Sequence, residues 1–451
     1  MHIHIRMWSI CMDRSYREGM GISIWLKPHF QLHDFFTSMI YLLLVTTFLN
    51  QSVLSIDVGS FSLFLYRIVL IAATVIFLLT VLKEGNLSYY WNQVHTKGIL
   101  LFLLLWMAYG CISLLWAKSV IDGFKYMTLL GMGILFVFLA VFTFTTIRSL
   151  YLFLMIWMSM TVFLMVLGFI NHFAHIQLPT STLYGGPSYK LSYPTSVFFN
   201  QNDFATFLSI SFFFYLSMAG NSKSSFIKVT TLFLAVLSVY TIYVTESRAS
   251  LLGVMLGLIA YGWILFPPFI KKLTMVIMAP MLVLSSVFFF EKWLGSSHDP
   301  LSSNVVRTNL LKNTFHYFVE TFGFGVGAGN LPFYLKNEPI YETNQVVEVH
   351  NWLAEIMGNF GIIIFLGYLI MYAYLFYCLV KIYQVFQEKH HRLLVEACML
   401  AMIGFLVSSS SPSTVSNLYF HWVFLGLVIA TVSVFRGKMR TAEGASEIWK
   451  S

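Results

Sequence analysis

Two arginines and one histidine are the residues of this chain whose types could carry out chemistry together. Arg248 directly follows one apolar stretch, Arg307 lies in a long segment between two others, and His350 precedes the next apolar stretch. A guanidinium keeps its charge at any relevant pH and can bind phosphate oxygens through two hydrogen bonds, so two arginines on one face would suit a diphosphate. A neutral imidazole is a common general base for a hydroxyl.

Each of these residues also has a plainer interpretation, which the sequence leaves open. Arg248 could be an interfacial arginine whose charged end reaches the lipid headgroups. Arg307 could be an ordinary solvated charge, and His350 could pack at an interface as an amphipathic ring. Glu355 falls inside an apolar stretch, where an ionisable group is costly and commonly functional.

The glycine run at 323–330 resembles a phosphate-binding loop only superficially. A nucleotide-binding fingerprint needs a preceding strand, a following helix and a parallel sheet, and the sequence predicts none of these. A tight turn with a close approach of two backbone segments is the simpler interpretation. His298, His316 and His391 show no metal-ligand spacing. We therefore expect neither a metal nor a cofactor.

The composition shows which elements must position these residues. Of 451 residues, only 10% are charged, while 58% are hydrophobic and 18% aromatic, and the mean hydropathy is +0.76. A soluble protein carries about 25% charged residues, and so few charges could not cover this much apolar surface in water. The four cysteines form no paired framework. The net charge of +8 is scattered along the chain, which argues against a nucleic-acid partner.

Twelve apolar stretches approach the length of about 20 residues that a helix needs to cross ~30 Å of hydrocarbon. They lie at 36–55, 61–82, 98–116, 127–146, 150–170, 203–219, 226–243, 250–269, 273–290, 352–380, 393–410 and 415–435. We therefore expect an all-α integral membrane protein, a bundle of about 12 transmembrane helices embedded in the lipid bilayer. A large external loop subdomain between spans 9 and 10, with helical spacing around 305–318, is expected to be ordered.

Most of the lysines and arginines fall on one side of this arrangement, which predicts that both termini are cytoplasmic. The N-terminal tail is too polar for a signal peptide, and Met1, Met7, Met12 and Met20 are alternative starts. The expected domains are a cytoplasmic tail (1–35), spans 1–9 (36–290), an external loop subdomain (291–351), spans 10–12 (352–435) and a second cytoplasmic tail (436–451).

Four motifs, in chain order, resemble those of the O-antigen ligase/polymerase superfamily of bacterial envelope polysaccharide enzymes, which includes teichuronic-acid, capsule and exopolysaccharide polymerases. They are Phe199-Asn-Gln-Asn-Asp-Phe-Ala205, Glu246-Ser-Arg-Ala-Ser250, Arg307 followed by Phe324-Gly-Val-Gly-Ala-Gly-Asn330, and His350-Asn-Trp-Leu353 with Gly358 and Gly361. The resemblance covers mainly 198–365. The family's Ser-Arg motif often continues with glycine, where this chain has Ala249.

The resemblance implies a metal-independent, inverting glycosyltransferase on the outer face of the bacterial cell membrane. Its donor would be a polyprenyl-diphosphate-linked oligosaccharide, and its acceptor a glycan hydroxyl. Arg248 and Arg307 would hold the diphosphate, and His350 would activate or position the acceptor. The other residues expected to bind substrate are Asn351, Asn200, Asn202, Gly327, Asn330 and Glu355. Contact with a flippase or a chain-length regulator is a further expectation.

Polymerases and ligases of this superfamily share these motifs, so the reaction itself has two interpretations. We expect a polymerase, which transfers a growing chain to the next lipid-linked repeat, because polymerases are the broader set. A ligase, which transfers finished glycan to a different acceptor, is the alternative. A lipid-linked oligosaccharide transporter is a second alternative, but the chain shows no internal repeat of the kind common in transporters.

Overall fold

The computed structural model describes residues 32–52, 55–58, 61–84, 87–265, 269 and 303–448, and it is helical, as expected. The helices are α1 Leu32–Leu49, α2 Leu65–Glu84, α3 Leu87–Gln93, α4 Lys97–Ser113, α5 Val120–Thr143, α6 Ile147–Ala174, α7 Gln201–Asn221, α8 Ser225–Val244, α9 Arg248–Leu265, α11 Ser303–Glu320, α12 Leu331–Asn337, α13 Trp352–Val385, α14 Lys389–Ser408 and α15 Tyr419–Ile448. One short antiparallel hairpin joins β1 Ile56–Val58 to β2 Phe61–Leu63, with Asp57 opposite Ser62.

Eight helices of the described residues are long and apolar enough to cross a membrane, namely α2, α5, α6, α7, α8, α13, α14 and α15. A ninth span results if α3 and α4, bent by 116° at a short break, count as one. The expected spans at 36–55 and 250–269 correspond to the shorter apolar helices α1 and α9. The span expected at 273–290 lies outside the described residues. The multi-span helical bundle is therefore confirmed, and twelve spans stay a prediction.

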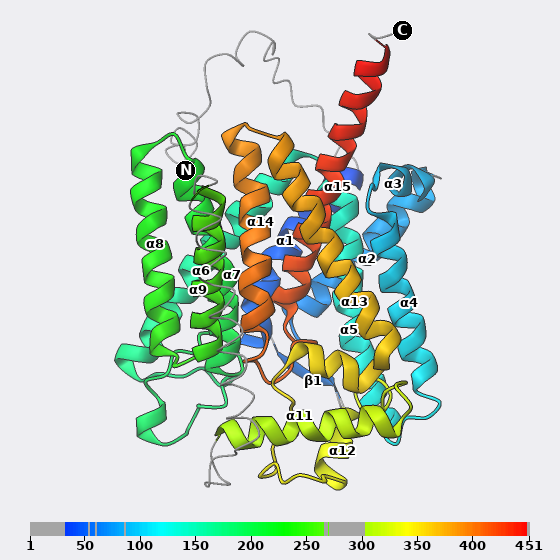
Figure 1. Cartoon of the computed structure of the whole chain (residues 1–451), viewed down its shortest axis with the longest axis vertical. Coiled ribbons are helices and arrows are strands. Elements are labelled where there is room, and N and C mark those ends of the chain that lie inside the picture. The colour runs from blue at the N-terminus through cyan, green and yellow to red at the C-terminus, as the bar shows by residue number, and fades with distance from the viewer. Residues whose placement is uncertain are drawn as a thin grey trace.

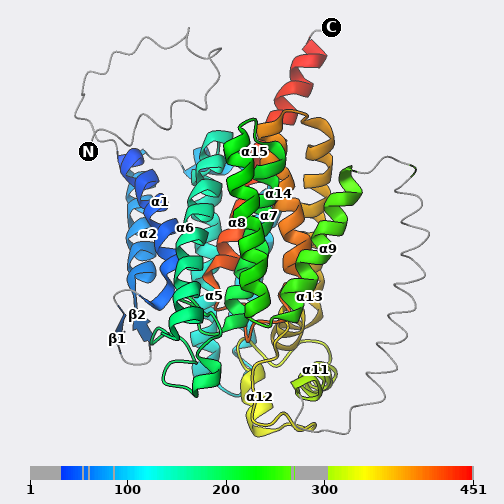
Figure 2. The same cartoon turned by 90° about the vertical axis from the view of Figure 1, so that its left-hand side faces the viewer.

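Helix α11 lies across one end of the bundle, roughly perpendicular to the spanning helices, and α12 lies next to it (Figures 1 and 2). We call this the site end. It carries the starts of α7, α9 and α13 and the loop between α14 and α15, whereas α1 begins and α15 finishes at the opposite end (Figure 2). Helix α15 continues to Ile448, beyond the end of the last expected span at 435.

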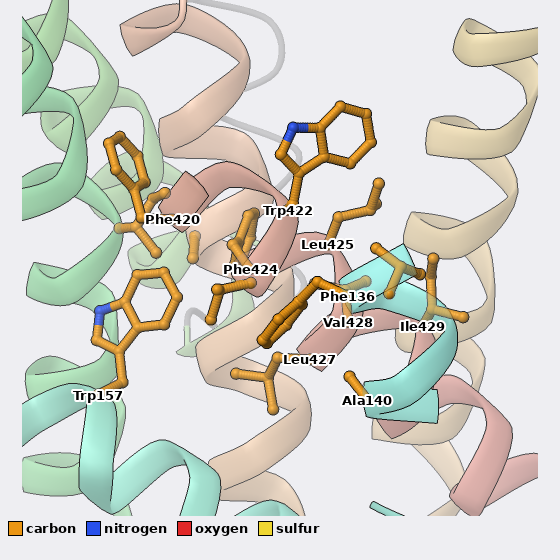
Figure 3. Packing of buried hydrophobic residues seen from close by; sticks show 14 of the residues in the cluster. Phe136, Ala140, Trp157, Phe420, Trp422, Phe424, Leu425, Leu427, Val428 and Ile429 are labelled. Carbon is orange, nitrogen blue, oxygen red and sulfur yellow. The ribbon is translucent and has the colours of Figure 1, made fainter. Parts of the chain in front are cut away.

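The core surrounds α15, whose spanning part is largely buried. Phe424 and Leu427 of α15 lie between Phe136 of α5 and Trp157 of α6 (Figure 3). Trp422 packs directly on the α5 backbone, since a Cβ built at Gly133 would lie 2.4 Å from its indole ring. Lipid tails are as apolar as these side chains, so close packing rather than the hydrophobic effect holds such helices together.

A break in α13 gives its first turns a direction of their own. Gly361 has φ 72° and ψ −166°, which only glycine adopts readily. At the break, the carbonyl oxygen of Gly323 accepts a 2.8 Å hydrogen bond from the N–H of Ile362. The glycine run thus packs into the break and fixes the segment 352–360, which begins two residues after His350.

Candidate functional site

A serine-rich loop joins α14 to α15 and contacts three of the four motifs that the sequence singled out, those at Asn200, Ser247 and His350. We call residues 409–417 (Ser-Ser-Ser-Pro-Ser-Thr-Val-Ser-Asn) the serine loop. Its partners come from α7, α9, α13 and the segment before α13, in hydrogen bonds with Asn200, Asn202, Ser247, His350, Trp352 and Glu355. This loop was not among the predicted site segments, although four consecutive serines before a proline between two apolar stretches were a readable signal.

The two asparagines of the first motif connect α7 to the serine loop. The Oδ1 atom of Asn200 caps α7 by accepting the N–H groups of Asn202 and Asp203 at 2.9 and 3.0 Å. Its Nδ2 donates to the hydroxyl of Ser413 at 3.1 Å. The Oδ1 of Asn202 accepts from the Ser411 hydroxyl at 2.9 Å. Both side-chain amides thus bind protein groups. In Asn200, both the oxygen and the nitrogen of the amide are engaged in this way.

His350 is held in an unusual backbone conformation by the same loop. Its φ of 53° lies in the left-handed region, which few residues other than glycine adopt and which is often found at functional sites. Its N–H donates to the carbonyl of Ser413 at 3.3 Å. The ring Nδ1 lies 3.3 Å from the carbonyl of Ser411. When Nδ1 carries the hydrogen and donates to this carbonyl, Nε2 is the basic nitrogen.

The electrostatics of His350 favour its neutral form. Burial lowers the pKa of the imidazole below its usual value, and the positive charge of Arg307 lowers this pKa further. The hydrogen bond to the Ser411 carbonyl and the charge of Glu348 raise the pKa and oppose this effect. Because the net shift is downward, His350 is a neutral base at physiological pH. Asn351, the next residue, caps α13 by accepting the N–H of Ala354 at 3.0 Å.

Arg248 and Arg307 lie close enough to affect each other. Burial lowers the pKa of the Arg307 guanidinium, and the charge of Arg248 lowers it further. Neither arginine forms an ion pair with a carboxylate in the part of the chain that the structure describes. Arg248 is exposed and begins α9, where the helix dipole adds positive potential. Two neighbouring guanidiniums at a helix N-terminus form a site for an anion such as a diphosphate.

Ser247 places Arg248 relative to the other two residues. Its hydroxyl lies 2.9 Å from that of Ser411 and donates to the hydroxyl of Ser250 at 3.1 Å. The serine loop therefore fixes the start of α9 and the His350 backbone at once. The structure places Arg307 within electrostatic range of both Arg248 and His350, and we call these three residues the cluster. Their roles with substrate stay a prediction.

Glu355 lies deeper than a substrate-binding residue would. Its buried carboxylate accepts hydrogen bonds from the hydroxyls of Tyr126 at 3.0 Å and Thr414 at 2.7 Å, and from the N–H of Val415 at 3.1 Å. Three protein donors therefore surround its oxygens. This placement favours an anchoring role for Glu355 toward the serine loop, and its expected contact with substrate stays a prediction.

The glycine run is likewise a structural element. A Cβ at Gly327 would lie 2.9 Å from the carbonyl oxygen of Ser113, so the two backbones touch. Asn330 is fully buried, and its amide exchanges hydrogen bonds with the backbone of Ser119 at 2.7 and 3.1 Å. Gly327 and Asn330 thus pack against the α4–α5 connection, and their expected contacts with substrate stay a prediction. The glycine run therefore has the close backbone approach that the tight-turn interpretation predicted.

One group of side chains with metal-ligand character lies elsewhere. The ligand atoms of Glu388, His390 and His391 lie within 4.8 Å of one another, at the end of the bundle opposite the site end. Sequence spacing had not indicated this group. It is remote from Arg248, Arg307 and His350.

Comparison with known proteins matches the region that contains the cluster. The sequence model of a family described as O-antigen ligase matches residues 233–369, which include Arg248, Arg307 and His350. The teichuronic acid biosynthesis protein TuaE of Bacillus subtilis (strain 168) is 49% identical over 421 residues, which cover 90% of this chain and 86% of that relative.

Proposed function

The chain belongs to the O-antigen ligase/polymerase superfamily, and from this membership we propose that it polymerises lipid-linked repeat units on the outer face of the membrane. It is a multi-pass bacterial membrane protein and an envelope polysaccharide polymerase or ligase of the glycosyltransferase type. The proposal adds the donor, a glycan on a polyprenyl diphosphate, and the product. The name of the relative supports a teichuronic-acid-type polymer.

The observation that carries the proposal is the cluster of Arg248, Arg307 and His350 around the serine loop. The arginines provide two fixed positive charges for the diphosphate of the donor, and His350 provides a neutral base for the acceptor hydroxyl. The position of Arg307, whose pKa is lowered by the charge of Arg248 and whose own charge lowers the pKa of His350, supports this assignment.

In the proposed mechanism, the acceptor oxygen attacks the anomeric carbon from the face opposite the diphosphate. The bond from that carbon to the phosphate oxygen breaks, so the configuration inverts, and the acceptor proton passes to Nε2 of His350. The two guanidiniums stabilise the charge that develops on the departing diphosphate. Because a diphosphate is already a good leaving group, positioning supplies much of the remaining rate enhancement. The two arginines provide the charge neutralisation for which other enzymes use a divalent ion.

The test is envelope glycan size in a deletion strain complemented with wild type, His350→Ala or Arg307→Ala. Loss of the polymer ladder down to single repeats on lipid supports a polymerase. Full-length polymer retained on its lipid carrier supports the ligase alternative, which the family description favours. Single repeats trapped on the inner face support the transporter. Lys336→Ala, an exposed lysine of α12, is the matched control and should leave the glycan unchanged.

A further inference from the structure

A cavity of about 220 Å³ with both apolar and charged lining residues opens at the site end beside the cluster. It lies between the first turns of α5, the start of α12, the segment that leads to His350 and the serine loop. Its polar and charged lining residues include Asp122, Lys125, Tyr126, Glu348, Ser413 and Asn417. Neither arginine of the cluster lines it, so it is distinct from the anion site.

Two of its lining side chains are charged and half-buried without an obvious partner. Within the described residues, Lys125 and Glu348 form neither a hydrogen bond nor an ion pair, although the charge of Glu348 acts on His350. Half-buried charges lose part of their hydration, and a ligand that hydrogen-bonds to them would restore it. These two side chains therefore indicate a polar ligand.

The chemistry of the lining fits a sugar ring better than a phosphate. Asp122, Glu348 and the deeper Glu355 are carboxylates, and they would repel an anion. Carboxylates accept hydrogen bonds from hydroxyls, Lys125 donates them, and such charge-assisted bonds are among the stronger ones. The ring of Tyr126 and nearby apolar side chains offer a surface for the C–H face of a sugar. A few convergent polar groups in an otherwise apolar hollow are typical of small-ligand sites.

The cavity shares a wall with the catalytic cluster. Glu348 and Val349 line it, and His350 follows directly in the chain. Ser413 also lines it, and the carbonyl of Ser413 accepts the N–H of His350. A ligand in the cavity therefore lies against the two segments that hold the backbone of the proposed base.

We propose that this cavity binds a sugar ring of the acceptor glycan, and that Lys125 and Glu348 determine acceptor specificity. The proposal rests on the proposed function, because it assigns the acceptor subsite of the same reaction. The donor diphosphate binds at the arginines, and the acceptor sugar binds at the carboxylates, so the two substrates meet at His350.

The experiment uses the full-length protein in detergent, a polyprenyl-diphosphate-linked repeat as donor and a soluble oligosaccharide of the same repeat as acceptor. Glu348→Gln and Lys125→Met should each raise the acceptor KM roughly tenfold, as expected for one lost charge-assisted hydrogen bond. The donor KM should stay unchanged. Lys336→Met is the matched control for loss of a lysine at this end, and thermal unfolding in detergent confirms that each variant is folded.

Direct binding of the acceptor oligosaccharide, measured by calorimetry without donor, separates failure of this proposal from failure of the proposed function. Arg307→Ala should abolish transfer but retain acceptor binding. Transfer with an unchanged acceptor KM in both cavity variants overturns the subsite alone. If the wild type binds acceptor but transfers nothing, and Glu348→Gln weakens that binding, the proposed function is overturned and the subsite is supported. A wild type that neither binds nor transfers overturns both.

Discussion

At the scale of single residues, the site divides into groups that we propose meet substrate and groups that hold neighbouring segments in place. Arg248, Arg307 and His350 combine charge or basicity with access to the site end. Asn200 and Glu355 instead direct their oxygens to protein donors. Polarity alone did not distinguish the two groups, because buried polar side chains must find partners whether or not they take part in chemistry.

The pH dependence of kcat should report the His350 imidazole. A base must be unprotonated, so the rate is full above its pKa and falls as the pH drops through it. Burial lowers this pKa, so the midpoint of the acid limb should lie below the ordinary value of about 6.5. The measurement is kcat against pH at saturating acceptor, from pH 4.5 to 8. A midpoint above the ordinary value would contradict the role of a buried base.

Glu348→Gln should move this acid limb further down. The negative charge of Glu348 raises the pKa of His350, so its removal makes the imidazole harder to protonate. The variant and the wild type are compared by the same kcat profile, with acceptor kept saturating. Glu342→Gln, an exposed acid in the same segment, serves as the control. An unshifted acid limb in Glu348→Gln would show that the charge of Glu348 does not act on the His350 imidazole.

Arg307→Lys should be nearly as damaging as Arg307→Ala. Lysine keeps the positive charge but cannot bind a phosphate group bidentately. We expect kcat/KM to fall by roughly 10²-fold, the scale of losing one preorganised donor to a developing anion. Initial rates of glycan transfer, normalised to protein level, test this, with Lys336→Arg as the reciprocal control. Near-normal activity of Arg307→Lys would show that charge alone suffices.

At the scale of elements, close backbone contacts fix the parts that carry the site. The start of α13 is set by the glycine run at the Gly361 break, and the start of α7 by its asparagine cap. The serine loop joins them to α9. The α7 cap is local, but the contacts that join the elements are not: Asn200 and Ser413 are 213 positions apart.

Gly361→Ala should destabilise the protein and disturb the site. A Cβ there would lie 2.1 Å from the carbonyl oxygen of Gly323, and the positive φ strains any side chain. The conformational strain alone costs about 1–3 kcal/mol, and the clash adds to it. Thermal unfolding in detergent measures the loss. Gly98→Ala, where nothing lies within 4 Å of the new Cβ, should be neutral. Equal stability of the two variants would contradict this account of the break.

Glu355→Ala should loosen the serine loop. The change leaves three donors, from Tyr126, Thr414 and Val415, without their acceptor. Each buried donor without a partner costs about 1–3 kcal/mol. Amide hydrogen exchange across 409–417 should rise, and Glu355→Gln, which keeps one carbonyl oxygen, should recover part of the protection. Unchanged exchange in Glu355→Ala would remove Glu355 from its anchoring role.

At the scale of the whole molecule, the cluster lies at one end of a membrane-spanning bundle, and the orientation of that end decides which substrates can reach it. We propose that the site end is external and that both chain ends are cytoplasmic, as the distribution of basic residues predicts. Lipid-linked repeats would then be polymerised after they reach the outer leaflet.

Cysteine labelling tests this orientation. In a chain whose own cysteines are replaced by serine, Lys336→Cys of α12 should react with a membrane-impermeant maleimide in intact protoplasts. Lys389→Cys, at the start of α14 on the opposite end, should react only after permeabilisation. The reverse labelling pattern would mean that the site end faces the cytoplasm. Labelling at both positions in sealed cells would mean that the probe had crossed the membrane.

The sequence by itself determined the membrane class, most of the spans and the three residues of the cluster. Hydropathy is a local property, because a helix crosses the bilayer with consecutive apolar residues, and the motifs are short runs of neighbouring positions. The tertiary structure decided what surrounds them: the serine loop, the anchoring of Glu355, the packing of Gly327 and Asn330, and the cavity beside His350. These features depend on contacts between distant segments, and helix packing rather than local sequence sets which distant segments meet.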